Sequence, residues 1–299
     1  MVNCRIDNFD ESTGPKNASW IIRYIRVIKP RETILLTFIG LCAGIVAGGG
    51  RPDVGTLLLA TLAILLGSGG TNGLTNYIDR ELDAKMERVR HRPLPSREIF
   101  PPQKMLPWAI GLVIAGLIIA WFLHWMCFLF GAVGVIVAAT FRKRVTCVFP
   151  QGALAGCSPV FIGYVAISKS VDWTLLFLCL LITIWIPLHV WSLMIAHRDD
   201  YRQAGITYFP MSHEIKSSVR VIPFLAVLLF ACSMGLYYVG QFDILYLIVA
   251  CIMGILTITS SARLIYTGLS RDSWKVYKLT AFPYLGILFL AMALDVWLL

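Results

Sequence analysis

Nine apolar segments, each about long enough to cross a bilayer, dominate this sequence of 299 residues. About 20 apolar residues in a helix span the hydrocarbon core, and only 14% of this chain is charged, whereas soluble domains have about 25%. The segments cover residues 33–49, 54–76, 105–123, 125–141, 153–168, 173–196, 220–239, 243–266 and 279–298. Since helices satisfy their own backbone hydrogen bonds in lipid, the sequence predicts an all-α, polytopic membrane bundle of nine transmembrane helices.

Lys and Arg residues are concentrated in alternate loops between these segments. Of the 26 Lys and Arg residues, 24 fall in the N-terminal arm or in the loops after the second, fourth, sixth and eighth segments. The two exceptions are Arg51 and Lys169. Lys and Arg mark cytoplasmic loops, so we expect the N-terminus inside and the C-terminus outside. This distribution explains the net charge of +9 without a nucleic-acid partner.

The N-terminal arm, residues 1–32, carries no targeting signal that we can identify. It lacks the apolar core of a signal peptide, and its early acids, Asp7, Asp10 and Glu11, are not typical of a mitochondrial transit peptide. We therefore expect the chain in the cytoplasmic membrane of a prokaryote. Residues 20–29 form an amphipathic stretch with basic and aromatic residues, which predicts a helix on the membrane surface.

Residues 33–299 are expected to form a single transmembrane domain with an internal repeat. Acidic segments at 79–83 and 199–200 each follow an inward-running span, and four spans separate them. This spacing predicts two four-helix repeats in the same orientation plus one final helix. Repeats often place a ligand site at their interface, so we expect the two acidic loops to face one shared mouth.

The first acidic loop follows the second span. Helical periodicity continues there until Pro93, and on that helix Asn76, Asp79, Asp83 and Glu87 share one face. Asp79 and Asp83 have no cation four residues further on. Magnesium binds through one or two carboxylates and completes its shell with water and phosphate oxygens, so this pair predicts a magnesium site.

Arg88 and Arg92 follow the acidic pair by one to two helical turns. Guanidinium groups suit bidentate capture of phosphate, so carboxylates and arginines together predict a site for a metal-bound diphosphate. The alternative is a solvated, salt-bridged helix end in a cytoplasmic loop.

The second acidic loop follows the sixth span and carries Asp199 and Asp200, with Arg198 and Tyr201 alongside. Its composition predicts a second locus for metal and diphosphate. An ordinary interfacial helix end of mixed charge is the alternative.

His189 lies inside the sixth span, where an ionisable residue suggests function. It could bind an acceptor, ligate a haem iron or act as a base, and it could equally be a hydrogen-bonded core residue. Lys143 and Arg144 follow the fourth span. They could bind phosphate from a third loop, or they could act only as positive charges that set the orientation of the chain in the membrane.

The two acidic loops and the loop after the fourth span also carry extended motifs. Residues 76–95 read NYIDRELDAKMERVRHRPLP, residues 197–205 read HRDDYRQAG, and residues 143–146 read KRVT. These motifs resemble those of the UbiA superfamily of intramembrane prenyltransferases, and within it the branch that transfers a farnesyl group to protohaem IX. The chain departs from the family pattern at Thr75, Val89 and Phe149.

The resemblance implies a UbiA-like fold, farnesyl diphosphate and protohaem IX as substrates, and haem O and diphosphate as products. It assigns Mg²⁺ and the catalytic role to Asp79, Asp83, Asp199 and Asp200. The residues it assigns to substrate binding are Asn72, Asn76, Arg88, Arg92, Lys143, Arg144, His189, Arg198 and Tyr201.

Three alternatives remain at this point. The first is a UbiA-type enzyme acting on a quinone precursor, a chlorophyll-type ring or a lipid glycerol. The second is an anion transporter, which predicts charges buried in the middle of the spans. The third is an assembly scaffold, which gives no reason for carboxylate pairs whose sequence places no cation four residues further on. The oligomeric state is not predicted.

Overall fold

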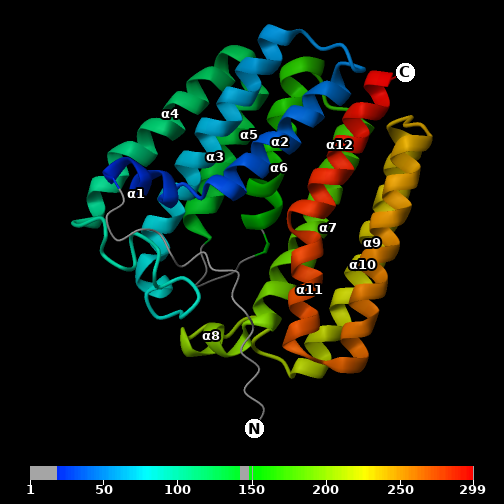
Figure 1. Cartoon of the computed structure of the whole chain (residues 1–299). Coiled ribbons are helices and arrows are strands. Elements are labelled where there is room, and N and C mark those ends of the chain that lie inside the picture. Colours follow the sequence, from blue (N-terminus) through cyan, green and yellow to red (C-terminus); the bar gives the residue numbers. More distant parts are fainter. Residues whose placement is uncertain (1–18, 142–147, 150, 299) are drawn as a thin grey trace.

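The computed structural model describes residues 19–141, 148–149 and 151–298, and these are largely helical (Figure 1). The described helices are α1 (Trp20–Val27), α2 (Pro30–Ala47), α3 (Val54–Asp83), α4 (Met105–Leu123), α5 (Trp125–Thr140), α6 (Gln151–Ser168), α7 (Trp173–Ala196), α8 (Arg198–Gln203), α9 (Ile215–Val239), α10 (Ile244–Thr267), α11 (Ser270–Thr280) and α12 (Phe282–Leu298). Residues 1–18 of the predicted arm and the predicted site residues Lys143 and Arg144 lie outside the described residues.

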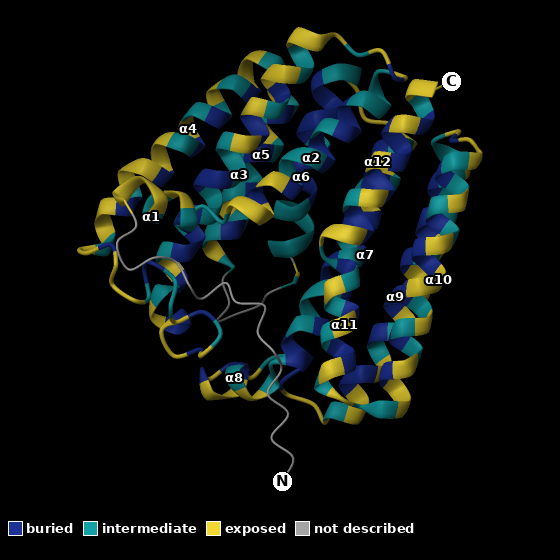
Figure 2. Cartoon of the chain, viewed as in Figure 1, coloured by how far each residue is buried: buried dark blue, intermediate teal, exposed yellow. Residues whose placement is uncertain are grey.

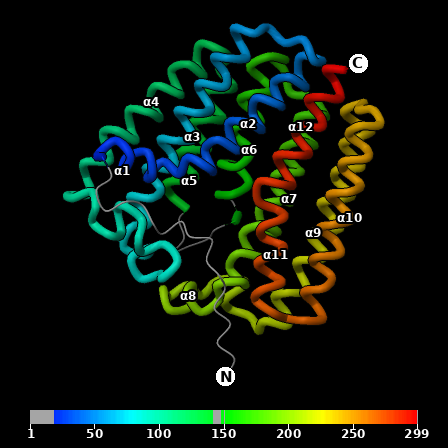
Figure 3. Tube along the Cα trace, viewed as in Figure 1, coloured from blue at the N-terminus to red at the C-terminus, as the bar shows by residue number. Residues whose placement is uncertain are grey.

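Each of the nine predicted spans corresponds to a helix of the described chain. Eight helical segments are long and apolar enough to cross a membrane, with α11 and α12 counted together, and α5 is apolar but shorter, at 16 residues. The protein is therefore a multi-pass membrane protein. The ninth span consists of α12 preceded by the more polar α11, and the two follow one another along one side of the bundle (Figure 3).

Short polar side chains fix where the long helices begin. The Asp53 carboxylate accepts a hydrogen bond from the backbone N–H of Thr56 at 2.7 Å and so starts α3. Asp172 starts α7 in the same way, through the N–H of Leu175 at 2.9 Å. Such caps satisfy backbone donors that have no partner inside the helix, so the spans begin at defined residues.

Small residues bring the first helix of each predicted repeat together. On α2, Gly40 and Gly44 are four residues apart and face α6. A Cβ atom placed on Gly163 of α6 would lie 1.9 Å from the carbonyl oxygen of Gly40, a distance that no side chain can occupy. Membrane helices pack closely through such small-residue pairs, and α2 and α6 cross here with their backbones in contact.

Exposed residues recur along the outer helices of the bundle (Figure 2), and many of them are large and apolar. On α10, Ile248, Ile252 and Ile255 form an exposed stripe, and on α4 Ile114 and Ile118 do the same. Water would penalise a surface of this kind, whereas the hydrocarbon of a bilayer matches it.

The loop after α3 and the short helix α8 lie at one end of the bundle, and the C-terminus lies at the other end (Figure 1). The prediction that the helix continues to Pro93 is wrong, because α3 ends at Asp83 and turns follow it. The physical reason is tertiary. The backbone N–H groups of Glu87 and Arg88 donate to the side chain of Asp200 and are not available to a helix.

Candidate functional site

One carboxylate joins the two acidic loops. One Asp200 side-chain oxygen accepts from the backbone N–H of Glu87 at 2.6 Å, and the other accepts from that of Arg88 at 3.2 Å. The residues involved are more than 110 positions apart in the sequence. The two loops therefore lie in contact at the same end of the bundle, and a mouth shared by both stays a prediction.

An apolar cluster holds the same two loops together beneath this hydrogen-bonded contact. Its buried members come from both segments, namely Leu82, Met86 and Val89 from the first and Met194, Tyr201, Ala204, Ile206 and Met211 from the second. Val89 departs from the family motif and is 1% exposed within this cluster. Its apolar side chain therefore contributes packing at this position.

The other two departures have different surroundings. Thr75 is buried, and its hydroxyl donates to the carbonyl of Asn72 at 3.0 Å. Phe149 is exposed.

Asp79 and Asp83 occupy the last turn of α3, with 3% and 1% of their surface exposed. Carboxylates this deeply buried carry charge only when a partner or ligand compensates it. Asp83 has such a partner in Arg92, whose Nη1 lies 3.9 Å from a carboxylate oxygen. Sequence spacing alone did not reveal this ion pair, because it forms across the turns that follow α3.

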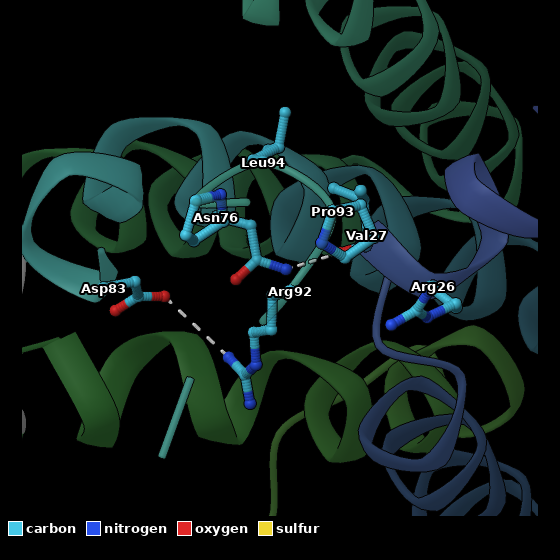
Figure 4. A pocket seen from close by; sticks show the side chains of 8 residues that line it. Arg26, Val27, Asn76, Asp83, Arg92, Pro93 and Leu94 are labelled. Atoms are coloured by element: carbon cyan, nitrogen blue, oxygen red, sulfur yellow. Dashed lines mark hydrogen bonds and ion pairs between the residues drawn. The ribbon is translucent and has the colours of Figure 1, made fainter. Parts of the chain in front are cut away.

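A small pocket opens beside Asp83 and Arg92 (Figure 4). Its other lining residues are Arg26 and Val27 of the N-terminal segment, Asn76 of α3, and Pro93, Leu94 and Pro95. The Asn76 amide donates to the carbonyl of Val27 at 2.5 Å, drawn as a dashed line in Figure 4. One wall of the pocket is therefore the segment that precedes α2.

Asn72 makes a similar contact one turn earlier on α3, since its amide donates to the Thr33 hydroxyl at 3.0 Å. Asn72 and Asn76 both connect α3 to the chain around the start of α2. Their role in substrate binding stays a prediction.

Arg88 is a predicted phosphate ligand that lies partly buried in the first loop. One of its terminal nitrogens lies 3.5 Å from the Tyr201 hydroxyl, and its Nε is buried without a hydrogen-bond partner. The Nε2 atom of His197 is also buried without a hydrogen-bond partner. Among the described residues these are the two buried side-chain polar atoms left unsatisfied. Buried polar groups normally have partners, and the Nε–H of Arg88 is a donor that a ligand oxygen would satisfy.

His197 lies between α7 and α8. Its ring packs edge-on against Trp274 with ring centres 5.1 Å apart. Burial and the nearby positive charge of Arg88 lower its pKa to about 4, although Asp200 acts in the opposite direction. The imidazole is therefore neutral at physiological pH.

Arg198 contributes to the shape of the second loop. Its guanidinium donates to the carbonyls of Pro210 and His213, and Arg202 donates to that of Met211. Asp199 is exposed at the start of α8. The predicted roles of Arg198 and Asp199 toward diphosphate and metal stay predictions.

Stacked aromatic rings line α7 and α11 next to this region. The His189 ring lies between Trp185, with ring centres 4.7 Å apart, and Tyr277, with ring centres 4.6 Å apart. Tyr277 in turn stacks on Trp274 at 4.7 Å, and Trp274 contacts His197. The column runs from inside the bundle to the end that carries the acidic loops. The sequence contained the rings, but their contact depends on the register between two distant helices.

In the described part of the chain, no three His, Cys, Asp or Glu side chains gather into a metal-binding group. Asp79 and Asp83 provide two carboxylates on one face of α3. Two carboxylates match the requirement of magnesium, which takes its remaining ligands from water and substrate phosphate.

Fold and site together define a class, that of polytopic membrane proteins with an acidic and arginine-containing site at one end of a helical bundle. Sequence comparison gives the particular family. The chain belongs to the UbiA prenyltransferase family, whose profile matches residues 34–292.

Two relatives show the extent of the similarity. The chain is 32% identical over 281 residues to a protein of Desulforudis audaxviator named protoheme IX farnesyltransferase. The aligned region covers 92% of this chain and 88% of the relative. A Picrophilus torridus protein named protoheme IX farnesyltransferase 1 is 33% identical over 273 residues, covering 89% and 91% respectively.

Solved structures share the fold at lower identity. A structure described as that of digeranylgeranylglyceryl phosphate synthase in membranes matches with a TM-score of 0.75 and 21% identity, covering 93% of this chain and 99% of that one. A UbiA homolog from Archaeoglobus fulgidus bound to GPP and Mg²⁺ matches with a TM-score of 0.61 and 13% identity, covering 90% and 99%.

Proposed function

We propose that this protein transfers the farnesyl group of farnesyl diphosphate to a vinyl group of protohaem IX, giving haem O and diphosphate. The observation that carries the proposal is the junction of the two loops, where Asp200 accepts hydrogen bonds beside Arg88. Contact between the two loops supports a single diphosphate site to which carboxylates and arginines of both loops would contribute. Relatives named protoheme IX farnesyltransferase, matched over about nine tenths of the chain, support the choice of substrates.

Asp79 and Asp83 would hold magnesium on the donor. Bound magnesium would neutralise the charge that develops on the leaving diphosphate. The UbiA homolog bound to GPP and Mg²⁺ supports a metal requirement for proteins of this fold. Asp199, exposed at the start of α8, would contribute from the second loop.

Arg88 and Arg92 would bind the diphosphate oxygens. Arg88 is suited to this because its buried Nε has a hydrogen to donate and no protein acceptor among the described residues. Arginine remains charged in this setting, so a ligand oxygen would gain a charge-assisted hydrogen bond. Asp200 would act by fixing the backbone that carries Arg88, and Lys143 and Arg144 would approach from the loop after α5.

In the reaction the bond between the farnesyl carbon and the diphosphate oxygen breaks, and the electron pair leaves with diphosphate. The resulting allylic cation is attacked by the π-electrons of the vinyl group, which forms the new carbon–carbon bond. Water then adds to the cationic carbon beside the ring and loses a proton, leaving a hydroxyl group. A site enclosed by apolar and aromatic side chains would keep water from quenching the first cation.

The acceptor would lie along the aromatic column. His189 lies seven residues before Ala196, where α7 ends, a distance of about 10 Å along the helix axis at 1.5 Å per residue, and Asp199 lies beyond that end on the separate helix α8. His189 would therefore lie too deep to bind the diphosphate, and its ring would contact a substrate inside the bundle.

We further propose that the acidic end of the bundle faces the cytoplasm of a prokaryotic cell, with the N-terminus inside and the C-terminus outside. The distribution of Lys and Arg supports this orientation. The domain would then receive both substrates from the membrane and its inner surface.

Mass analysis of the haems tests the proposed reaction. Membranes containing the protein are incubated with haem, isotope-labelled farnesyl diphosphate and Mg²⁺, and we expect label to appear in a haem of increased mass. The control variant Asp83→Asn should form little of this product. Unchanged haem together with diphosphate release would indicate another acceptor, and the absence of diphosphate release would refute the assignment as a transferase.

A further inference from the structure

Thr280 contacts the ring of His189 from a neighbouring helix. It is the last residue of α11 and is fully buried. Its Oγ1 lies 3.3 Å from Nδ1 of His189. Either atom could be the donor in this pair, so its direction depends on what else the threonine hydroxyl does.

The hydroxyl hydrogen of Thr280 is already used within α11. Oγ1 lies 2.8 Å from the carbonyl oxygen of Val276 and 3.2 Å from that of Tyr277, which is the usual bond of a helical threonine to the preceding turn. A hydroxyl has one hydrogen, so toward His189 the oxygen acts as the acceptor. Assigned from this network, the proton of His189 is on Nδ1, and Nε2 carries a lone pair.

The same residue also holds the aromatic ring on the other side of His189. The Thr280 backbone carbonyl accepts a hydrogen bond from Nε1 of Trp185 at 2.5 Å. Such a bond is possible because the helix is interrupted next to Thr280, where Ala281 has a ψ of −121°. Thr280 thus fixes both the proton position of His189 and one of the two rings between which it lies.

We infer that Thr280 is a positioning residue that presents Nε2 of His189 as an axial ligand to the iron of the haem acceptor. The inference rests on the proposed function, which supplies haem as the substrate. A neutral imidazole with one nitrogen donating to a protein oxygen is the usual form of a metal-bound histidine, and the outer contact sets which nitrogen binds. His189 coordinates through Nε2, and Thr280 acts through Nδ1.

Haem-binding spectroscopy on the purified full-length protein tests this role without turnover. Ferric haem is titrated into the wild type, Thr280→Val, Thr280→Ser and His189→Ala, and the absorption spectrum reports the axial ligand. Thr257→Val is the matched control, because Thr257 is equally buried and bonds to its preceding turn at 2.7 Å but belongs to α10. Metal-free protoporphyrin is titrated in parallel, since it binds the same pocket without an iron to ligate.

We expect Thr280→Val to weaken ferric haem binding about 10-fold, the lower end of the effect of losing an outer contact to a metal ligand. Binding of metal-free protoporphyrin should not change, whereas damage to the pocket would weaken both. Thr280→Ser should behave like the wild type, and His189→Ala should lose the nitrogen-ligated spectrum and regain it with added imidazole. In the wild type itself, resonance Raman of the ferrous complex should show an iron–histidine stretch, a result that needs no variant.

The inference is overturned if the iron–histidine stretch is absent, or if Thr280→Val leaves the ligation and the haem affinity unchanged. Product formation from farnesyl diphosphate, measured on the same samples, separates the two levels of the account. Haem O formation without histidine ligation refutes only the inference, whereas a protein that neither binds nor modifies haem refutes the proposed function as well.

Discussion

Removing the Asp200 carboxylate should release the first acidic loop from the second. In Asp200→Ala, the backbone N–H groups of Glu87 and Arg88 lose acceptors that lie 2.6 and 3.2 Å away. A hydrogen bond to a charged group contributes about 1.5–3 kcal/mol, and Asp200 is only half-buried, so the lower value applies to each. The loop should lose about 3 kcal/mol of protection against local opening.

Hydrogen exchange followed by mass spectrometry measures this loss directly. Since about 1.4 kcal/mol corresponds to a factor of ten, the amides of Glu87 and Arg88 should exchange about 100-fold faster in Asp200→Ala. The matched control is Asp199→Ala, which removes the neighbouring carboxylate but no hydrogen bond to this loop among the described residues. Equal protection in the wild type and Asp200→Ala, or equal loss in both variants, would refute the reasoning.

Three further predictions follow from individual contacts. Arg88→Ala should raise the KM for farnesyl diphosphate at least about 10-fold, because a charge-assisted hydrogen bond of about 1.5 kcal/mol or more is lost. Arg90→Ala is the kinetic control, because Arg90 is an exposed neighbour. Burial lowers the pKa of His197 to about 4, so between about pH 6.5 and pH 4 the unfolded chain binds a proton that the folded chain does not bind. As the pH falls over that range, the wild type should therefore lose stability more steeply than His197→Gln. Thermal unfolding at several pH values measures this difference, and parallel profiles for the two proteins would contradict it. Gly163→Ala should lower the melting temperature by forcing α2 and α6 apart, at a cost of at least about 1–3 kcal/mol, whereas Gly111→Ala, with open space around its Cβ position, should not.

The membrane spans could be predicted because a single physical requirement determines them. About 20 apolar residues are needed to cross the hydrocarbon core, and each predicted segment is a helix in the described chain. Charge distribution between the loops added the expectation that residues 79–83 and 199–200 share one end of the bundle. The hydrogen bonds of Asp200 agree with that expectation.

Features that depend on contacts between distant segments could not be predicted in the same way. Local periodicity extended the helix after Asp79 to Pro93, but Asp200 competes for the backbone donors and α3 ends at Asp83. The ion pair of Asp83 with Arg92 forms only because of those turns.

The aromatic column is a second feature of this kind. His189 attracted attention as an ionisable residue in a span, but Tyr277 and Thr280 lie about 90 residues further on. Nothing in their local sequence indicates that they contact an imidazole. Only the packing of α11 against α7 makes the connection.

A structure of the protein with Mg²⁺ and a non-reactive thio analogue of farnesyl diphosphate would test the central claim most directly. We predict that the diphosphate group lies between the two loops, in contact with Arg88 and with metal held by Asp79 and Asp83, and that the farnesyl chain extends into the bundle. A diphosphate bound to one loop alone, or at the opposite end of the helices, would contradict the account.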